Sequence, residues 1–328
     1  MLETLEVLAV LCAALFAGAA LYISVVEHPR VGAWTPSSRQ RDGRMLGGML
    51  YRSYAPLRVL ADLVDDFWLY DDYRPQHLRE RILPSGTVEL VINLRKDELR
   101  IYDRVRPGVC ERFSGAVVSG TYDRSFVIDT AEEASLLGVH FRPGGAFPFF
   151  GLPVSELVDT HVDLETLWGR SSSELRERLR NAPRPSDKFR VLEAMLVARL
   201  SSVSMQGDVV RFAVDALSRL GVTTVHDVTQ RVGVSHRRFI EVFKTHVGLT
   251  PKLFHRVRRF QRVVAHVQRA ATLEWSHLAV DFGFFDQSHL IRDFGEFSGF
   301  SAAEFARHLH ELERRGVHLK RHHLPLAG

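Results

Sequence analysis

The chain of 328 residues contains only two cysteines, Cys12 and Cys110. They form neither a metal-ligand spacing nor a disulfide framework, so the sequence argues against zinc ligation and against a disulfide-stapled extracellular fold. A cysteine-dependent DNA-repair methyltransferase module needs several cysteines and is excluded for the same reason. Two cysteines fit a protein of the reducing cytoplasm.

The middle of the chain lacks a catalytic or metal-binding constellation. Between Tyr51 and Ser204 the only histidines are His77, His140 and His161, and they do not have the His-x-His plus Glu spacing of a metal-binding cupin. No residues pair as nucleophile and base or as acid and base. The sequence therefore predicts no enzyme, no catalytic residue, no metal site and no cofactor.

Two features of the same segment leave alternatives open. The backbone N–H groups of Arg142-Pro-Gly-Gly145 could cradle an anion, or the segment could form a plain turn. Glu89, within an apolar run, could line a pocket or face water.

Positive charge is concentrated in the C-terminal part of the chain. The net charge is +4, yet from Met205 onward there are 18 Lys and Arg residues against 12 Asp and Glu residues, an excess of six. Twelve of the 16 histidines also lie there, and most are expected to face solvent or a groove rim rather than a metal. A partner of opposite charge, such as a phosphate backbone, would prefer this part of the chain.

The basic part also contains an internal repeat, which is informative about architecture. The apolar positions of Val225–Val234 recur at Trp275–Phe284 with an offset of 50, and the offset becomes 51 from Asp286 onward. Apolar residues at i, i+3 and i+7 give the first helix of each copy one buried face.

Each copy has the signals of a helix-turn-helix. A glycine follows the first helix, where a left-handed cap would turn the chain, and a small residue precedes that glycine by four positions. A good N-cap then starts the second helix. The residues are Gly233, Thr229 and Ser235 in the first copy, and Gly283, Ala279 and Asp286 in the second. The alternative is two ordinary helical hairpins in a bundle.

The second copy, Gly-Phe-Phe-Asp-Gln-Ser-His-Leu-Ile-Arg-Asp-Phe at 283–294, strongly resembles the second helix-turn-helix of AraC/XylS-type transcriptional regulators. Gly-Leu-Thr-Pro at 248–251 and Arg259-Phe260 match the first half, and the resemblance covers about 210–312. It implies two helix-turn-helix units on one linker helix, expected over Pro251–Gln268, that bind successive major grooves of double-stranded DNA. The departures are Thr229, Glu241, Gly295 and Ala302, of which Glu241 and Gly295 put phosphate contacts at those two positions in doubt.

We expect each recognition helix to bury two apolar anchors and to present its remaining residues to the groove. The anchors are Phe239 and Phe243 in the first helix and Leu290 and Phe294 in the second. Arg suits guanine, Gln suits adenine, and Glu can accept from cytosine. Lys244 and Arg256 are expected to meet phosphates, and Arg259 could do so or form a structural ion pair. The predicted DNA-binding residues are His236, Arg237, Ile240, Glu241, Lys244, Arg256, Gln287, Ser288, His289 and Arg292.

The segment 49–204 reads as a separate sensor domain of mixed α/β structure. Helices are expected over Leu57–Trp68, Glu156–Val158, Leu164–Trp168, Ser173–Leu179 and Lys188–Leu200. Val88–Leu94 and Leu99–Tyr102 are expected to form a hairpin, followed by strands over Val117–Tyr122, Ser125–Asp129 and Leu136–Phe141. Tyr73-Arg-Pro, 83–94 and 138–145 resemble the DUF6597-like domain of some AraC-type regulators. That resemblance implies effector sensing or dimerisation and names no ligand.

The N-terminal segment 1–30 is hydrophobic. Val7 to Val26 contains no charged residue and is long enough to span a bilayer, and the arginines after it would place the C-terminal side in the cytoplasm. Residues 16–30 resemble the first helix of DUF1772, anthrone-oxygenase-like membrane proteins, whose remaining fold is absent. The segment is either a membrane anchor, or a fusion remnant or start-site artefact ahead of a regulator that begins near Met49.

The sequence thus predicts an α+β protein, in which a mixed sensor domain precedes an all-α domain of two helix-turn-helix units joined by a linker helix. The expected function is a one-component, sequence-specific transcriptional regulator in the cytoplasm. The alternatives are a regulator anchored in the inner membrane through 7–26 and a ligand-binding enzyme with an accessory DNA-binding domain. Expected partners are double-stranded DNA, a small-molecule effector, RNA polymerase and a second copy of the chain. The expected parts are a hydrophobic helix at 1–30, a linker at 31–48, the sensor domain at 49–204, the DNA-binding domain at 205–312 and a basic tail at 313–328. The tail is expected to be disordered, and the alternative is that it touches phosphate.

Overall fold

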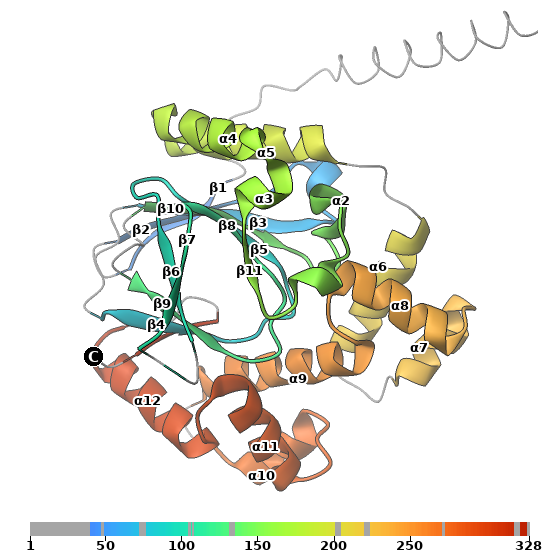
Figure 1. Ribbon diagram of the computed structural model, residues 1–328. Coiled ribbons are helices and arrows are strands. Elements are labelled where there is room, and N and C mark those ends of the chain that lie inside the picture. The colour runs from blue at the N-terminus through green and yellow to red at the C-terminus, as the bar shows by residue number, and fades with distance from the viewer. Residues whose placement is uncertain are drawn as a thin grey trace, which may run out of the picture. The chain divides into compact units, whose positions relative to one another are not determined.

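The fold is α+β, with a β-rich N-terminal domain followed by a helical domain (Figure 1). We call the first the sensor domain, after the role that the sequence predicts for it. The computed structural model describes residues 40–46, 49–71, 77–103, 106, 108–130, 135–200, 205–219, 224–270, 273–317 and 322–326.

A seven-stranded antiparallel sheet forms the centre of the sensor domain. Its strand order is β1-β2-β3-β10-β5-β8-β11. The strands are β1 (Gln40–Leu46), β2 (Met49–Tyr54), β3 (Val64–Asp71), β5 (Glu89–Asn93), β8 (Ala116–Ser119), β10 (Ser135–Phe141) and β11 (His161–Asp163).

A second, five-stranded antiparallel sheet has the order β12-β4-β9-β6-β7. Its strands are β4 (Arg79–Ile82), β6 (Leu99–Tyr102), β7 (Cys110–Phe113), β9 (Phe126–Asp129) and β12 (His323–Pro325). Four of these belong to the sensor domain, whereas β12 follows the helical domain in the chain.

The helices of the sensor domain are short up to residue 168 and longer after it. They are η2 (Arg58–Leu60), α2 (Phe147–Phe150), η4 (Val154–Leu157), α3 (Leu164–Trp168), α4 (Arg170–Asn181) and α5 (Pro185–Arg199). The helical domain contains α6 (Met205–Ser218), α7 (Val225–Val232), α8 (His236–Val247), α9 (Pro251–Val267), α10 (Trp275–Asp281), α11 (Gln287–Ser298) and α12 (Ala302–Arg314).

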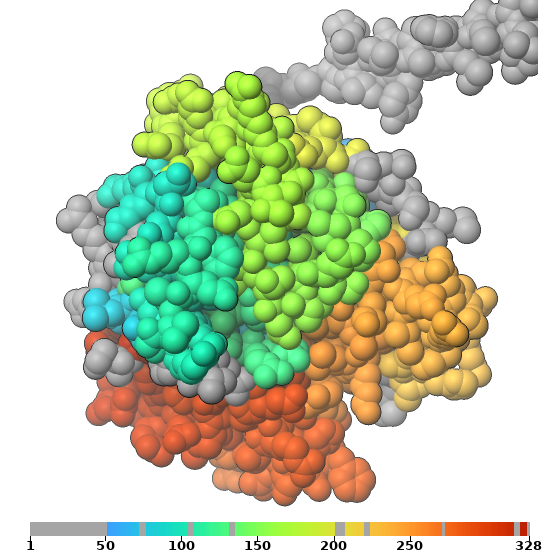
Figure 2. Space-filling view, in the orientation of Figure 1, coloured from blue at the N-terminus to red at the C-terminus, as the bar shows by residue number. Residues whose placement is uncertain are grey.

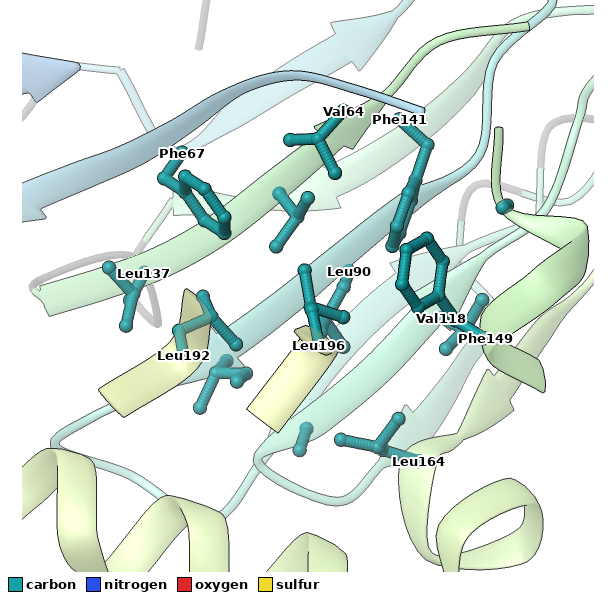
Figure 3. Packing of buried hydrophobic residues seen from close by; sticks show 14 of the residues in the cluster. Val64, Phe67, Leu90, Val118, Leu137, Phe141, Phe149, Leu164, Leu192 and Leu196 are labelled. Atoms are coloured by element: carbon teal, nitrogen blue, oxygen red, sulfur yellow. The ribbon is translucent and has the colours of Figure 1, made fainter. Parts of the chain in front are cut away.

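One face of the seven-stranded sheet packs against α2–α5. Because successive side chains of a strand point to opposite faces, Phe67 and Leu69 of β3 enter this core, and Trp68 and Tyr70 do not. Figure 3 shows Phe67, Leu90 and Leu137 from the sheet beside Leu192 and Leu196 of α5. This apolar layer is the main core of the sensor domain.

The other face of the sheet packs against the five-stranded sheet. Trp68, Tyr70, Val117 and Leu136 cluster there with Leu99 of β6. A cavity of about 70 Å³ remains between the sheets, and Glu89 and His161 are among its lining residues. This confirms a pocket-lining position for Glu89. Its carboxylate also lies 3.1 Å from Nε2 of His322.

His161 lies half-buried between the sheets as a neutral imidazole. Ser119 Oγ lies 3.3 Å from its Nε2, and the Tyr122 hydroxyl contacts its Nδ1. Burial lowers the pKa of His161 to about 3, although the carboxylate of Glu89 opposes this shift. The folded protein therefore resists protonation of His161 at pH values where the unfolded chain accepts a proton.

We expect this difference to make the protein acid-sensitive. The unfolded histidine takes up a proton below about pH 6.5, so the contribution of His161 is fully present above that pH and declines as the pH falls toward 3. At pH 5 the loss is about 2 kcal/mol. Denaturant unfolding of wild type and His161→Asn at pH 7.5 and pH 5 measures this loss of stability. His236→Asn, at an exposed position, is the control. An equal pH dependence in wild type and His161→Asn would contradict the assignment.

The helix predicted over Leu57–Trp68 is wrong. Only the single turn η2 forms, and β3 begins at Val64. Since β3 is buried on both faces, its apolar residues run continuously instead of alternating, and short runs of that kind fit a helix equally well.

The hairpin predicted for Val88–Leu94 and Leu99–Tyr102 is also wrong. β5 pairs with β10 and β8, whereas β6 pairs with β7 and β9 of the other sheet. The turn between them does form, since the Asn93 side chain accepts from the backbone N–H groups of Arg95 and Lys96. It leads the chain from one sheet to the other.

Both segments expected to lack structure contain a strand. Residues 40–46 of the expected linker form β1, which pairs with β2. Residues 323–325 of the expected tail form β12, which pairs with β4. Leu324 is only 1% exposed there, and His323 Nδ1 lies 2.8 Å from the buried Glu80 carboxylate. Burial and ion pairing over a long sequence separation explain why local composition did not reveal β12.

Within the described ranges, no helix has the length and apolar character needed to cross a bilayer. The hydrophobic segment Val7–Val26, and with it the predicted resemblance of residues 16–30, lies outside those ranges.

Candidate DNA-binding interface

The first repeat folds as a helix-turn-helix made of α7 and α8. Thr224 caps α7 in a capping box with Asp227, and Gly233 ends the helix with φ +68°. Ser235 then accepts a hydrogen bond from the backbone N–H of Arg238 and starts α8. Thr229 is buried beside the turn, as its position four residues before the glycine predicts.

The second repeat forms the same motif from α10 and α11. Gly283 has φ +71°, and Asp286 caps α11 by accepting a 2.7 Å hydrogen bond from the backbone N–H of His289. Ala279 is 2% exposed, and its carbonyl accepts from Phe284 N at 2.8 Å. Because Ala279 is buried, a much larger side chain would have to displace its neighbours.

The linker helix α9 joins the two units and supplies their shared core. Its 17 residues start at a Thr250 cap, close to the predicted range Pro251–Gln268. Phe243 packs on Phe254 near its start, and Phe294 packs edge-to-face on Phe260 near its middle. At about 1.5 Å per residue the helix spans about 26 Å. With the width of the two units added, this suits the roughly 34 Å between successive major-groove faces.

The predicted groove-facing residues of α8 are accessible. Phe239 and Phe243 are fully buried, which leaves the opposite side of the helix free. His236, Arg237, Glu241 and Lys244 are exposed, and Ile240 is half-buried. Glu241 lies 3.3 Å from Arg237 and 3.5 Å from Arg238. Exposed pairs of this kind contribute little to stability, so these arginines can exchange the carboxylate for a base or phosphate.

The predicted residues of α11 divide into two groups. Gln287, Ser288 and Arg292 are exposed, opposite the buried anchors Leu290 and Phe294. His289 is half-buried, because its ring packs on Phe284 and its Nε2 lies 3.3 Å from Nη2 of Arg259. The structure therefore makes three of these four side chains freely accessible.

Arg256 and Arg259 of α9 are tied to α11 by acidic residues. Asp293 is 2% exposed and accepts from Arg256 Nη2 at 2.8 Å and from Arg259 Nη2 at 3.0 Å. Glu296 holds Arg256 from a second side at 2.6 Å. Arg259 also donates to the Gly283 carbonyl at 2.8 Å. Of its two alternatives, Arg259 thus forms the structural ion pair, and Arg256 pairs with the same carboxylate.

Sequence reasoning missed Phe285, which is 92% exposed in the turn before α11. Val280 of α10 is also exposed. The repeat offset changes from 50 to 51 between Phe284 and Asp286, so Phe285 is the extra residue of the second turn. That insertion is the feature of the sequence that could have identified Phe285. An exposed aromatic at this place suits an apolar contact with a thymine methyl group.

Both units contact the sensor domain on surfaces away from the predicted groove residues. Figure 2 shows the two units side by side with the sensor domain. At the first unit, the rings of His246 and Phe147 lie 4.3 Å apart. At the second, Ser125 N donates to the Phe297 carbonyl at 3.0 Å, and Arg81 Nη1 donates to the Ser298 carbonyl at 2.9 Å. Sensor and DNA-binding elements are therefore in direct contact.

Two protein families match the chain. Residues 228–308 match the family described as a helix-turn-helix domain, which is of the AraC type. Residues 52–163 match a domain of unknown function, DUF6597. No curated protein matches the chain. The domain content points to a transcription regulator rather than an enzyme.

Solved structures of ToxT from Vibrio cholerae are similar to the chain at low identity. An apo ToxT variant from strain SCE256 has a TM-score of 0.39 and 10% identity, covering 81% of this chain and 99% of ToxT. ToxT from strain O395 bound to (E)-4-(8-methylnaphthalen-1-yl)but-3-enoic acid has a TM-score of 0.39 and 10% identity, covering 74% and 99%. ToxT from strain SCE256 bound to an unsaturated fatty acid has a TM-score of 0.39 and 9% identity, covering 73% and 94%. Likenesses this distant assign no residue and no ligand.

Proposed function

We propose that this chain, a DNA-binding transcriptional regulator with an AraC-type helix-turn-helix domain, reads two successive major grooves with α8 and α11. The observation that carries the proposal is the pair of matched units on one linker helix, each with a buried aromatic or aliphatic anchor side and an accessible polar side. A regulator of this kind acts on the chromosome, so we expect it in the cytoplasm.

The accessible side chains of the recognition helices are assigned to contacts with bases. From α8 these are His236, Arg237, Ile240 and Glu241, and from α11 they are Gln287, Ser288 and Arg292, with His289 at the edge of the contact. Lys244, near the C-terminal end of α8, is assigned to a phosphate, which positions the helix without specifying sequence. Arg256 is assigned to holding α11 through Asp293.

Two substitutions test this division of roles. Arg292→Ala should weaken binding to the preferred site by about 1–3 kcal/mol and relax the preference at one base position. Lys244→Ala should weaken binding to all sequences alike and lower the salt slope by about one. Selection from a random DNA pool by the full chain, followed by fluorescence anisotropy at several salt concentrations, measures both effects.

Arg190→Ala is the matched control, because Arg190 lies on α5 of the sensor domain and pairs with Asp187 at 3.2 Å. It should leave affinity and salt slope unchanged. Uniform weakening across all sequences by Arg292→Ala as well would overturn the assignment of Arg292 to a base.

We also propose that the sensor domain receives a small-molecule effector, and that RNA polymerase and a second copy of the chain are further partners. Direct contact between sensor residues and both helix-turn-helix units supports effector control, because a change in the sensor reaches the DNA-binding elements without an intervening linker. The cavity between the sheets, about 70 Å³, is well below the roughly 300–1,000 Å³ of typical ligand sites.

A further inference from the structure

The second helix-turn-helix unit exposes two large apolar side chains at its turn. Phe285 is 92% exposed and Val280 is 77% exposed, and no other large apolar side chain of the described residues is as exposed as either. Val280 lies in the last turn of α10, and its carbonyl accepts from Gly283 N at 3.1 Å. Phe285 comes two residues after this glycine, directly before the cap of α11. Single exposed apolar residues are common, but two at one turn mark it as a candidate contact surface.

The first unit has no equivalent of this apolar surface. One residue, Val234, separates its turn glycine from the cap of α8, whereas Phe284 and Phe285 separate the two in the second unit. At the repeat offset of 50, Val280 corresponds to Gln230, which is polar. A contact made by this surface therefore belongs to the second unit alone.

The turn holds the ring of Phe285 outward, because the preceding residue points inward. Phe284 is 7% exposed, its backbone N–H donates to the Ala279 carbonyl at 2.8 Å, and the guanidinium of Arg259 lies 3.9 Å from the centre of its ring. The backbone N–H of Phe285 donates to Nδ1 of His289 at 3.4 Å. Since the backbone of the turn is fixed in this way, a contact made by the exposed ring costs less ordering entropy.

Phe285 lies at the end of the recognition helix where base contacts are made. In helix-turn-helix proteins, the N-terminal residues of the second helix contact base edges in the major groove. Gln287 and Ser288 are the first two residues of α11, and both are exposed. A solvent-facing side chain that precedes Gln287 by two positions can reach the same groove.

The chemistry of the side chain selects its partner in that groove. Phenylalanine has no hydrogen-bonding group, and the apolar group on the base edges of the major groove is the C5 methyl group of thymine. A protein partner fits less well, because the centre of a protein interface is apolar. The exposed side chains that follow Phe285 on α11 are polar, namely Gln287, Ser288 and Arg292.

We infer that Phe285 is a base-reading residue, which contacts the C5 methyl group of a thymine in the half of the DNA site bound by α11. The inference rests on the proposed function and deepens it, since it assigns a base preference to a residue outside the recognition helix. Because the first unit has no counterpart of Phe285, the two halves of the site differ in this preference. Burial of one methyl group against the ring should strengthen binding about fourfold.

Selection from a random DNA pool, by the full chain and by its variants, gives the first test. Wild type should enrich thymine at one position of the α11 half, which is the half where Arg292→Ala relaxes a base preference. Phe285→Ser should lose this thymine preference alone, and Phe285→Leu, which keeps an apolar side chain, should retain it. Leu78→Ser, at a position of the sensor domain that is 71% exposed, is the matched control and should select the wild-type site.

Replacing that thymine with deoxyuridine in the selected duplex removes only the methyl group and keeps the base pair. Fluorescence anisotropy should show wild-type binding weakened about fourfold and the binding of Phe285→Ser unchanged by the replacement. With a C·G pair at the same position, 5-methylcytosine should bind wild type more tightly than cytosine does, because it carries the same methyl group. Deoxyuridine in the α8 half should affect wild type and Phe285→Ser equally.

An equal effect of deoxyuridine at the selected position on wild type and Phe285→Ser would assign the methyl group to another residue and overturn the inference. Wild-type selection and affinity in Phe285→Ser would also overturn it, and would leave the exposed ring to a protein partner. A preferred site without a thymine that depends on Phe285 removes this inference and leaves the proposed function intact. If wild type selects no preferred site, the proposed function fails and the inference fails with it.

Discussion

Replacing Asp293 with alanine is expected to destabilise the protein by about 3–5 kcal/mol. Asp293 is 2% exposed and lies between Arg256 and Arg259, at 2.8 and 3.0 Å. Without it, the buried guanidinium of Arg259 would keep its contact with the Gly283 carbonyl but would have no carboxylate partner. Breaking one half of a buried ion pair leaves an uncompensated charge, which costs more than the pair itself contributes.

Urea unfolding followed by circular dichroism measures this loss. Asp293→Asn, which keeps an acceptor of the same shape, should lose less, and Asp281→Ala at an exposed position of α10 should change stability by no more than about 0.5 kcal/mol. A loss below about 1 kcal/mol for Asp293→Ala would mean that Arg256 and Arg259 do not depend on this carboxylate.

Leu324→Ala is expected to cost about 2–5 kcal/mol, although it lies close to the end of the sequence. Leu324 is 1% exposed and packs with the core of the helical domain while its strand pairs with β4 of the sensor domain. Truncation would leave a cavity between the two domains. The same denaturation experiment measures the loss.

Leu78→Ala is the matched control for this substitution, because Leu78 directly precedes β4 and is 71% exposed. It should change stability by no more than about 0.5 kcal/mol. Equal, small effects of the two substitutions would show that β12 is not part of the folded core.

The helix-turn-helix units could be predicted from sequence because their signals are local. The N-caps and the turn glycines each act within a few residues, and the repeat contains each of them twice. They are Ser235 and Gly233 in the first unit and Asp286 and Gly283 in the second. Both recognition helices therefore begin next to the predicted caps, and their buried anchors are the predicted ones.

The strand pairings could not be predicted in the same way. β5 and β6 are neighbours in sequence but belong to different sheets, and nothing in the turn at Asn93 reveals which partner each strand takes. The ion pairs of Arg256 could not be predicted for a related reason. Its partners Asp293 and Glu296 lie 37 and 40 residues away, so an arginine that looks free on the linker helix is held by carboxylates of α11.

The position of β12 also bears on how the protein is made. Its partner β4 is synthesised early, yet Glu80 and His323, which meet in the finished sheet, are 243 residues apart. While the chain emerges from the ribosome, β4 has an unpaired edge until residues 323–325 appear, and such edges pair readily with other chains. We expect incomplete translation products that lack β12 to aggregate. The second sheet therefore gains its edge strand β12 only in chains whose DNA-binding domain has already been synthesised.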